Sequence, residues 1–288
     1  MMAIHLIADS TCDLTAELCE QYHITILPLY VTLNDVEHQD GVNIHAEDIF
    51  RHVAAGGSLP KTAAATVADY VGAFRNFLNQ NPEDEIICIT ISAKFSSCYQ
   101  NACIAAEETG HVTVIDSMNL STGFGHVVLT AAEMINAGKT VAEIADTLQN
   151  DIIPNVDASF ILDRLDYLHK GGRCSAVAAL GANLLKLKPC IEVHNGEMSV
   201  GKKYRGNFVH CVTEYAKDRL ANMDSIDNHR IFVTHANASK DAVGAAEAAI
   251  RASGRFELIE ETQAGCTVSS HCGPNTLGVL FIRKPSGV

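Results

Sequence analysis

The sequence predicts an α/β protein built from two α/β domains with mostly parallel sheets. Short apolar runs alternate with longer segments of helical periodicity, a pattern typical of parallel strands joined by helices. The 288 residues are enough for two domains that each bury a core. The periodicity lapses around Pro154, so we expect one domain at residues 1–155 and a second at residues 156–288.

In the first half, uninterrupted apolar runs predict strands, and apolar residues at every third or fourth position predict helices. The expected strands are residues 4–8, 24–33, 86–91 and 112–115, and the expected helices are residues 14–22, 46–55, 67–78, 97–108, 122–136 and 141–149. Asp13 and Thr66 stand where a side-chain oxygen can accept from the free N–H groups of a first helical turn, so we expect both to be N-caps. The Gly56-Gly57 pair is expected to end a helix.

The second half repeats these patterns after the boundary. Its expected strands are residues 159–162, 189–193, 197–200, 231–234, 256–260 and 277–282, and its longest expected helices are residues 207–220 and 240–252. We find neither an internal repeat nor a low-complexity tract in the sequence, so the two halves are expected to be ordinary α/β units.

Charge and hydropathy exclude two classes of function. The chain carries 21 basic and 34 acidic residues, a formal net charge of −13, and lacks a Lys/Arg cluster that could hold a phosphate backbone, which argues against nucleic-acid binding. Its apolar runs fall short of the roughly 18 residues that a transmembrane helix needs, and residues 1–5 do not open a signal-peptide pattern. We therefore expect a cytoplasmic protein that works through a small-molecule site or a protein partner.

The ten cysteines include no C-x-x-C spacing. In an intracellular chain they are expected to be reduced thiols, most of them buried as small apolar side chains. Neither they nor the 13 histidines form a local ligand pair, so we expect no metal site.

Hydroxyl side chains follow several of the expected strands. They are Ser10 and Thr11 after the first strand, Ser96 and Ser97 after strand 86–91, Ser117 after strand 112–115, and Thr62 ahead of a helix. One interpretation is that each is a helix N-cap. The other is that they converge with free helix N–H groups on an anion site without a cationic side chain, suited to a carboxylate or phosphate.

His271 and two glycines also stand out. His271 lies between small residues and precedes Gly-Pro, so we expect it in a tight turn, where it is as consistent with a structural role as with donation to an anion. Gly123 and Gly125 open like a dinucleotide fingerprint, but Val128 stands where the last glycine belongs. That departure favours packing against a helix or a ligand for both glycines.

Six blocks of sequence, in order along the chain, resemble the motifs of the DegV family of bacterial fatty-acid-binding proteins. They are DSTCDL at residues 9–14, ISAKFSSCYQNA at 91–102, VIDS at 114–117, LDYLHKGGR at 165–173, LKP at 187–189 and HCGP at 271–274. The chain departs from the family pattern at residues 63–65, which are all alanine, at Ser97 in place of a glycine, and at Asn275.

The resemblance implies a ligand site between the two α/β domains, with a long-chain fatty acid in an apolar tunnel and no cofactor. It also implies that the protein is not an enzyme but a carrier, which presents the fatty-acid carboxylate to a separate ATP-dependent kinase that forms an acyl phosphate. Transient contact with a membrane surface is left open. By this resemblance the carboxylate ligands are Thr62, Ser96 and His271 with support at Ser97.

Further residues are expected to have supporting roles. The residue pattern itself, rather than the resemblance, gives the supporting strand-end positions Ser10, Thr11, Ser117, Gly123 and Gly125. Under the resemblance, Arg173 and Arg205 are expected to dock the kinase or to steer its nucleotide, and the alternative is that both are solvated surface residues.

Two alternatives to a carrier remain at this point. One is a hydrolase of a small acyl or phosphate ester that uses Ser96 and His271, although the G-x-S-x-G elbow of such enzymes is absent from the sequence. The other is a regulatory module that binds a different anionic small molecule. Labelling of Ser96 by an acyl or fluorophosphonate probe would favour the first, and a ligand screen by thermal shift would identify the second.

Overall fold

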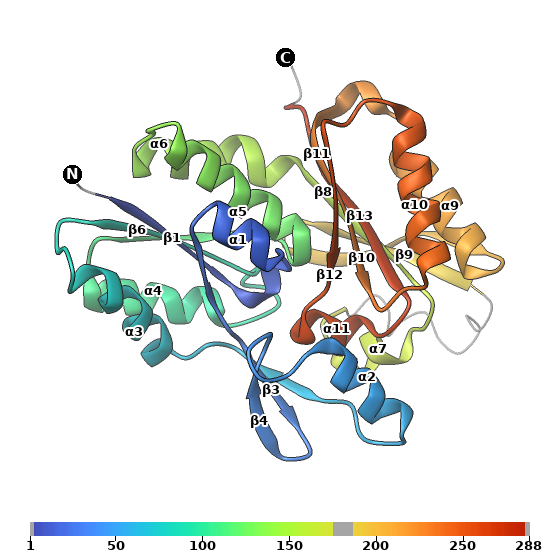
Figure 1. Ribbon diagram of the computed structural model, residues 1–288, viewed down its shortest axis with the longest axis horizontal. Coiled ribbons are helices and arrows are strands. Elements are labelled where there is room, and N and C mark those ends of the chain that lie inside the picture. Colours follow the sequence, from blue (N-terminus) through green and yellow to red (C-terminus); the bar gives the residue numbers. More distant parts are fainter. Residues whose placement is uncertain (1–2, 175–186, 286–288) are drawn as a thin grey trace.

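The computed structural model describes residues 3–174 and 187–285, and it places two sheets on either side of a central helix, α5 (Ser121–Asn136) (Figure 1). The first sheet is parallel throughout and has the strand order β2 (Ile24–Leu27), β1 (Ile4–Asp9), β6 (Glu85–Thr90) and β7 (Val112–Asp116). The helices α3 (Val67–Leu78) and α4 (Cys98–Thr109) cover one face, and α5 and α6 (Val141–Thr147) cover the other. The α/β class predicted from the sequence is therefore confirmed.

The second sheet is mixed. Its order is β10 (Glu197–Arg205), β9 (Leu187–His194), β8 (Val156–Leu162), β13 (Thr276–Arg283), β11 (Ile226–Ala236) and β12 (Leu258–Gln263). Among its described strands only β11 and β12 run parallel, so the prediction of mostly parallel strands is wrong for this sheet. The helices α9 (Phe208–Arg219) and α10 (Lys240–Ser253) cover its outer face.

The β9–β10 connection gives the physical reason for one antiparallel pair. Asn195 and Gly196 link the two strands, and both have positive φ angles, 49° and 78°. A two-residue turn of this kind reverses the chain directly and so joins only antiparallel neighbours.

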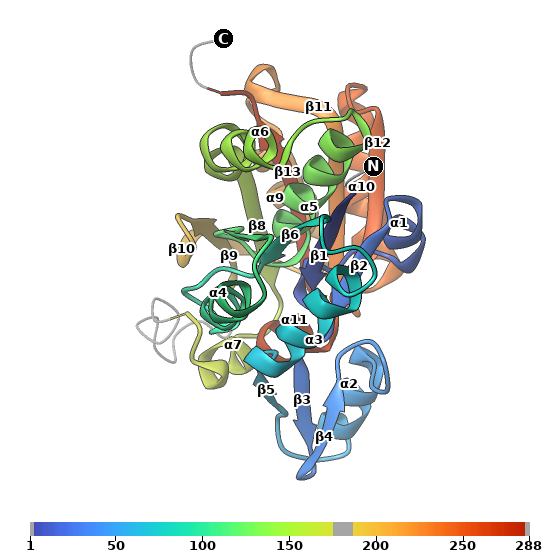
Figure 2. The ribbon, with the colours of Figure 1, turned by 90° about the vertical axis from the view of Figure 1, so that its left-hand side faces the viewer.

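A small third sheet lies at one end of the molecule with α2 (Ala46–Ala54) (Figure 2). The expected strand at residues 24–33 breaks at Pro28 into β2 of the first sheet and β3 (Tyr30–Leu33), which pairs with β4 (Val36–Gln39) and β5 (Lys61–Ala63). Ile49 and Phe50 of α2 pack with residues of α7 (Asp166–Gly171) and α11 (Cys266–Cys272), so this part of the first half shares a core with the second half.

The helix α5 joins the two large sheets. Phe124, Val127 and Val128 are fully buried and belong to one cluster that includes residues of both sheets. A Cβ at Gly123 would lie 2.9 Å from the Cβ of Ala158 in β8, and one at Gly125 would lie 2.9 Å from the carbonyl oxygen of Cys12. The two glycines therefore allow close packing on opposite sides of the helix. The expected domain boundary between residues 155 and 156 stays a prediction.

Two expected helix starts have different outcomes. Thr66 caps α3 in a capping box with Asp69, as predicted. Asp13 does not cap α1 (Ala16–Gln21), because Thr15 does so, and Asp13 is instead buried in a left-handed conformation.

The described residues also form short helical turns, which are η1 (Ser10–Cys12), η2 (Leu148–Ile152), η3 (Ile153–Asn155) and η5 (Met223–Ser225). Within the described ranges, no helix combines the length and apolar character needed to cross a bilayer.

Candidate functional site

A cavity of about 930 Å³ lies between the loop that follows β6, the small sheet, α11 and the inner face of the second sheet. The first sheet contributes the carboxyl end of β6 and the start of α4, which is where ligands collect in open parallel sheets. Segments from both halves of the chain therefore form its wall.

The second sheet supplies the floor of the cavity through alternate residues of its strands. Thr276, Gly278 and Leu280 of β13 face the cavity, with Ala158 and Phe160 of β8 beside them. The small side chains in the middle of this face leave the space that larger ones would fill. Gly278 is confined as well, because a Cβ there would lie 2.9 Å from the carbonyl oxygen of Ser159.

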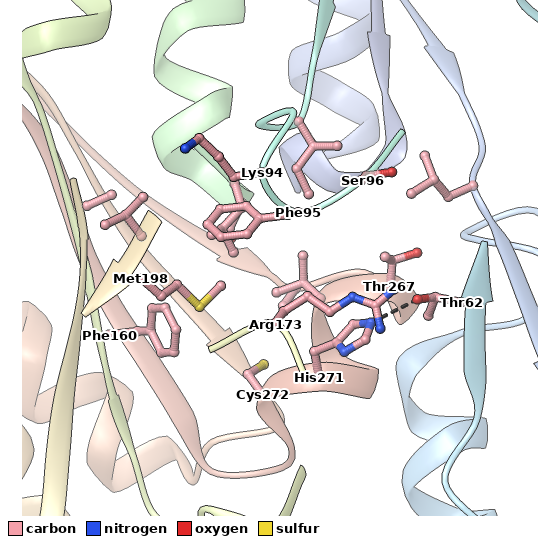
Figure 3. Close-up of a pocket in the computed structure, with 18 of the residues that line it drawn as sticks. Thr62, Lys94, Phe95, Ser96, Phe160, Arg173, Met198, Thr267, His271 and Cys272 are labelled. Atoms are coloured by element: carbon pink, nitrogen blue, oxygen red, sulfur yellow. Dashed lines mark hydrogen bonds between the residues drawn. The ribbon is translucent and has the colours of Figure 1, made fainter. Parts of the chain in front are cut away.

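The cavity has one apolar end and one polar end (Figure 3). Phe160 and Met198 lie at one side of the close-up with Phe95 near them, whereas Thr62, Thr267, His271 and Arg173 lie together at the other, with Ser96 beyond them. Lys94 lies beside Phe95, but its exposed ammonium group is paired with Glu197. Lining of this composition suits an elongated apolar molecule with a polar head.

The polar end is organised around a hydrogen bond between Thr62 of β5 and His271 of α11. The Thr62 Oγ1 and His271 Nε2 atoms are 2.8 Å apart. His271 lies in the last turn of α11, so the expectation of a tight turn was wrong, and Gly273, with a φ of 76°, follows directly after the helix.

Burial keeps the imidazole neutral. Desolvation, followed by the positive charge of Arg173, lowers the pKa of His271 from 6.5 to about 4. Its Nδ1 is buried without a hydrogen-bond partner in the described structure. A proton on Nε2 leaves no buried N–H unpaired and is donated to Thr62, which frees the threonine hydroxyl to donate into the cavity.

Gly171 at the end of α7 packs against this imidazole. A Cβ at Gly171 would lie 2.5 Å from His271 Nδ1, so a side chain here would displace the ring. Gly171 belongs to the LDYLHKGGR block, and its role therefore has a steric explanation.

Ser96 and Ser97 stand at the beginning of α4. The Ser96 hydroxyl accepts from Cys98 N at 3.3 Å and donates to Cys98 Sγ at 3.2 Å, a weak acceptor that a ligand carboxylate could replace. Ser97 occupies the N-cap position, is exposed, and makes no side-chain capping bond. Both residues line the cavity, and the amino end of this twelve-residue helix adds a favourable field for an anion.

The two arginines expected to dock a partner are placed differently. Arg173 lines the cavity beside His271, although its side chain is exposed, and donates to the carbonyl oxygen of Gly171 at 2.8 Å. An anion site without a cationic side chain was expected, and the structure places this guanidinium at it. Arg205 is exposed at the end of β10 and is not among the cavity residues.

The strand-end residues Ser10, Thr11 and Ser117 do not reach the cavity. The Ser10 hydroxyl accepts from Leu29 N at 3.1 Å, Thr11 donates to Asp9 at 2.5 Å, and Ser117 donates to the carbonyl oxygen of Asn119 at 3.2 Å. Gly123 and Gly125 are also outside the cavity lining and serve the packing of α5. These five positions therefore have local structural roles.

Sequence reasoning missed the apolar end and one buried pair at the amino end of α11. Phe160 and Met198 gave no signal, because only the placement of the two sheets brings them to the cavity. Asp13 and Asp40 accept hydrogen bonds from the first N–H groups of α11, contacts between segments more than 200 residues apart. Thr267 and Cys272 also line the cavity. Their closeness to His271 in the sequence was the one signal that could have identified them.

The geometry of Ser96 and His271 does not favour a hydrolase. His271 Nε2 is hydrogen-bonded to Thr62, and Ser96 is hydrogen-bonded to Cys98, so the two residues do not form a nucleophile–base pair. With a pKa of about 4, the imidazole would also be a weak base at neutral pH.

A family model and a similar protein both indicate the same family for this chain. A family model described as an uncharacterised protein of the DegV family matches residues 3–284. A DegV domain-containing protein of Clostridium acetobutylicum is 33% identical over 99% of this chain and 100% of its own length.

Solved structures have the same fold. One, described as fatty acid binding of a DegV family protein from Thermus thermophilus, superposes with a TM-score of 0.90 at 29% identity, covering 98% of this chain and 100% of that one. Another, described as a stearic acid-binding protein from Eubacterium ventriosum, gives a TM-score of 0.85 at 26% identity and covers 99% of both chains.

Proposed function

This chain belongs to the DegV family, and we propose that it binds a long-chain fatty acid in the cavity between its two large sheets. The observation that carries the proposal is the one-sided polarity of the cavity. Phe95, Phe160 and Met198 lie away from the hydrogen-bonded pair of Thr62 and His271. An acyl chain would gain free energy by leaving water at the first end, and its carboxylate would find donors at the second.

Neutral donors would hold most of the carboxylate. The Thr62 hydroxyl is free to donate, and the hydroxyls of Ser96 and Ser97 lie at the same end of the cavity. Arg173 adds a positive charge at an exposed position, where solvent screens it. A carboxylate bound mainly by neutral groups keeps more of its nucleophilicity than one in a tight buried ion pair.

The position of the polar end of the cavity supports a carrier role. Ser97 and Arg173 are both exposed, so the carboxylate would be bound close to the protein surface. We propose that a separate ATP-dependent fatty-acid kinase approaches this surface in the cytoplasm, phosphorylates the carboxylate and contacts Arg173 and Arg205. The chain itself would perform no phosphoryl transfer, and any contact with a membrane surface would be transient.

Mass spectrometry of lipid released from the natively purified protein tests the binding proposal. We expect a long-chain fatty acid in the wild type and about tenfold weaker retention in Thr62→Val, because a hydrogen bond to a charged group contributes roughly 1.5–3 kcal/mol. Arg173→Ala should weaken retention less, and Arg205→Ala is the matched control that should leave it unchanged.

Two results would contradict the proposal. One is a wild-type protein that releases no acyl lipid and binds no added fatty acid. The other is equal loss of retention in Thr62→Val and Arg205→Ala, which would remove the assignment of the polar end.

A further inference from the structure

Two buried acidic side chains hold the amino end of α11, and burial raises the pKa of Asp13 to about 8, so that it is a neutral carboxylic acid at neutral pH. Asp40 is 3% exposed and accepts hydrogen bonds from Cys266 N at 2.7 Å and Thr267 N at 2.8 Å. Asp13 is 5% exposed and accepts from Gly265 N at 2.8 Å. The first N–H groups of this helix are therefore satisfied by residues from the distant first half of the chain.

The helix depends on these contacts because it is short. With seven residues, α11 is well below the length at which an isolated helix is stable in water. Its far end carries His271 and Cys272 into the cavity. Any shift of α11 therefore changes the position of His271 relative to Thr62.

Asp40 and Thr62 are attached to the same small sheet. Thr62 in β5 pairs with Val31 in β3, and Asp40 follows β4, which pairs with the other edge of β3. The small sheet thus meets α11 at two points, through Asp40 at the beginning of the helix and through Thr62 at its end.

We propose that Asp40 is a positioning residue of the fatty-acid site, which fixes α11 so that the His271 imidazole meets the Thr62 hydroxyl at the polar end of the cavity. The part of this inference that concerns the ligand rests on the proposed function. The part that concerns His271 does not, because it is a property of the protein without ligand.

Asp13 provides a matched comparison, because the hydrogen-bond partners of the two acidic side chains differ. The Asp40 Oδ2 atom also accepts from the Ser10 hydroxyl at 3.3 Å, but each of the two Asp40 oxygens accepts from a backbone N–H group, which can only donate. An asparagine at position 40 would set its own NH₂ group against one of them. The second partner of Asp13 is the Ser121 hydroxyl, at 2.5 Å, which can turn to accept from an asparagine NH₂.

The experiment compares Asp40→Asn with Asp13→Asn in the full chain. Side-chain ¹⁵N NMR of histidine-labelled, delipidated protein reports the tautomer and hydrogen bond of His271, and the fatty-acid dissociation rate is measured after loading. We expect Asp40→Asn to change the His271 signal. We also expect it to speed fatty-acid dissociation about tenfold, which is the effect of losing one hydrogen bond between the polar end and the ligand carboxylate. Asp13→Asn should change neither.

A second variant covers the case in which Asp40→Asn does not fold. Cys266→Pro removes one of the two N–H donors at the first helical position, where proline is tolerated. Gly265 before it is already extended, with a φ of −64° and a ψ of 179°. This variant should change the His271 signal in the same way. It also removes the buried thiol that contacts the carbonyl oxygen of Ile44 at 3.2 Å, so Cys266→Ala, which lacks the thiol but keeps the N–H, is its control and should leave the His271 signal unchanged.

The outcomes separate the two proposals. An unchanged His271 signal in folded Asp40→Asn or Cys266→Pro overturns the positioning role, and so does an equal change in Asp13→Asn. If the His271 signal changes as expected but the wild type binds no fatty acid, the positioning role stands and the proposed function fails.

Discussion

The two ends of the cavity are built in different ways. Its apolar end is largely one face of the second sheet, where alternate residues of β8 and β13 point the same way because of the pleat. Its polar end brings together Thr62, Ser96, Arg173 and His271 from four separate segments, held by specific hydrogen bonds. The apolar end should therefore set how long a tail fits, while the polar end should set how tightly any carboxylate is bound.

The largest expected effect comes from filling the apolar floor with Gly278→Val. The new side chain would meet the Ser159 carbonyl oxygen and occupy space above β13. Displacing three or four methylene groups, each contributing ~0.8 kcal/mol, should weaken stearate binding by about a hundredfold. Calorimetric titration with stearate and laurate should show a much smaller loss for the shorter acid.

Val279→Ala is the control for that variant. Val279 is the neighbour of Gly278 on β13, but it packs in the second core, on the other face of the sheet. It should lower stability without changing the preference for chain length. An equal loss of stearate and laurate in Gly278→Val would show that tail length is not set at this floor.

A smaller effect is expected at the polar end from Gly171→Ala. Its Cβ would displace the His271 ring and break the hydrogen bond to Thr62. Stearate and laurate should both bind about tenfold more weakly, because the change removes a contact near the carboxylate and leaves the tail untouched. A loss confined to stearate would contradict the division between the two ends.

The last effect is on stability rather than on binding, concerns pH and again belongs to the polar end. The pKa of His271 is about 4 in the folded protein and 6.5 ordinarily, so between these values the unfolded chain binds a proton that the folded chain does not. The free energy of unfolding should therefore fall as pH is lowered through this range, by about 3 kcal/mol from this residue.

Urea unfolding at several pH values measures this contribution. His271→Gln should reduce the slope between pH 4 and 6.5, whereas Phe160→Leu at the apolar end should leave it unchanged. His126, whose pKa burial also lowers to about 4, lies outside the cavity and should maintain part of the slope in both variants. An identical slope in wild type and His271→Gln would show that His271 is not held neutral.

Sequence reasoning worked best for the first sheet. The strands expected at residues 4–8, 86–91 and 112–115 agree with β1, β6 and β7 to within a residue at each end, because each is a short, mostly apolar run. In the second sheet the same periodicity says nothing about strand direction. The Asn195-Gly196 turn is a local signal for an antiparallel pair, and the prediction from periodicity did not use it.

The candidate site was predictable only in part. Family motifs placed Thr62, Ser96, Ser97 and His271, and the structure brings all four to one cavity. No local pattern could show that α11 is a helix, since its sequence is rich in weak helix formers and its first N–H groups are paired with Asp40 from the other half of the chain.

The helix α5 also bears on how the protein unfolds. Its buried residues belong at once to the packing of β1 and to that of β8 and β13, so neither large sheet can lose its partner without exposing Phe124 and its neighbours to water. We therefore expect the two halves of the sequence to unfold in one cooperative transition. A fragment that ended at residue 155 would keep α5 and leave one whole side of it without a partner.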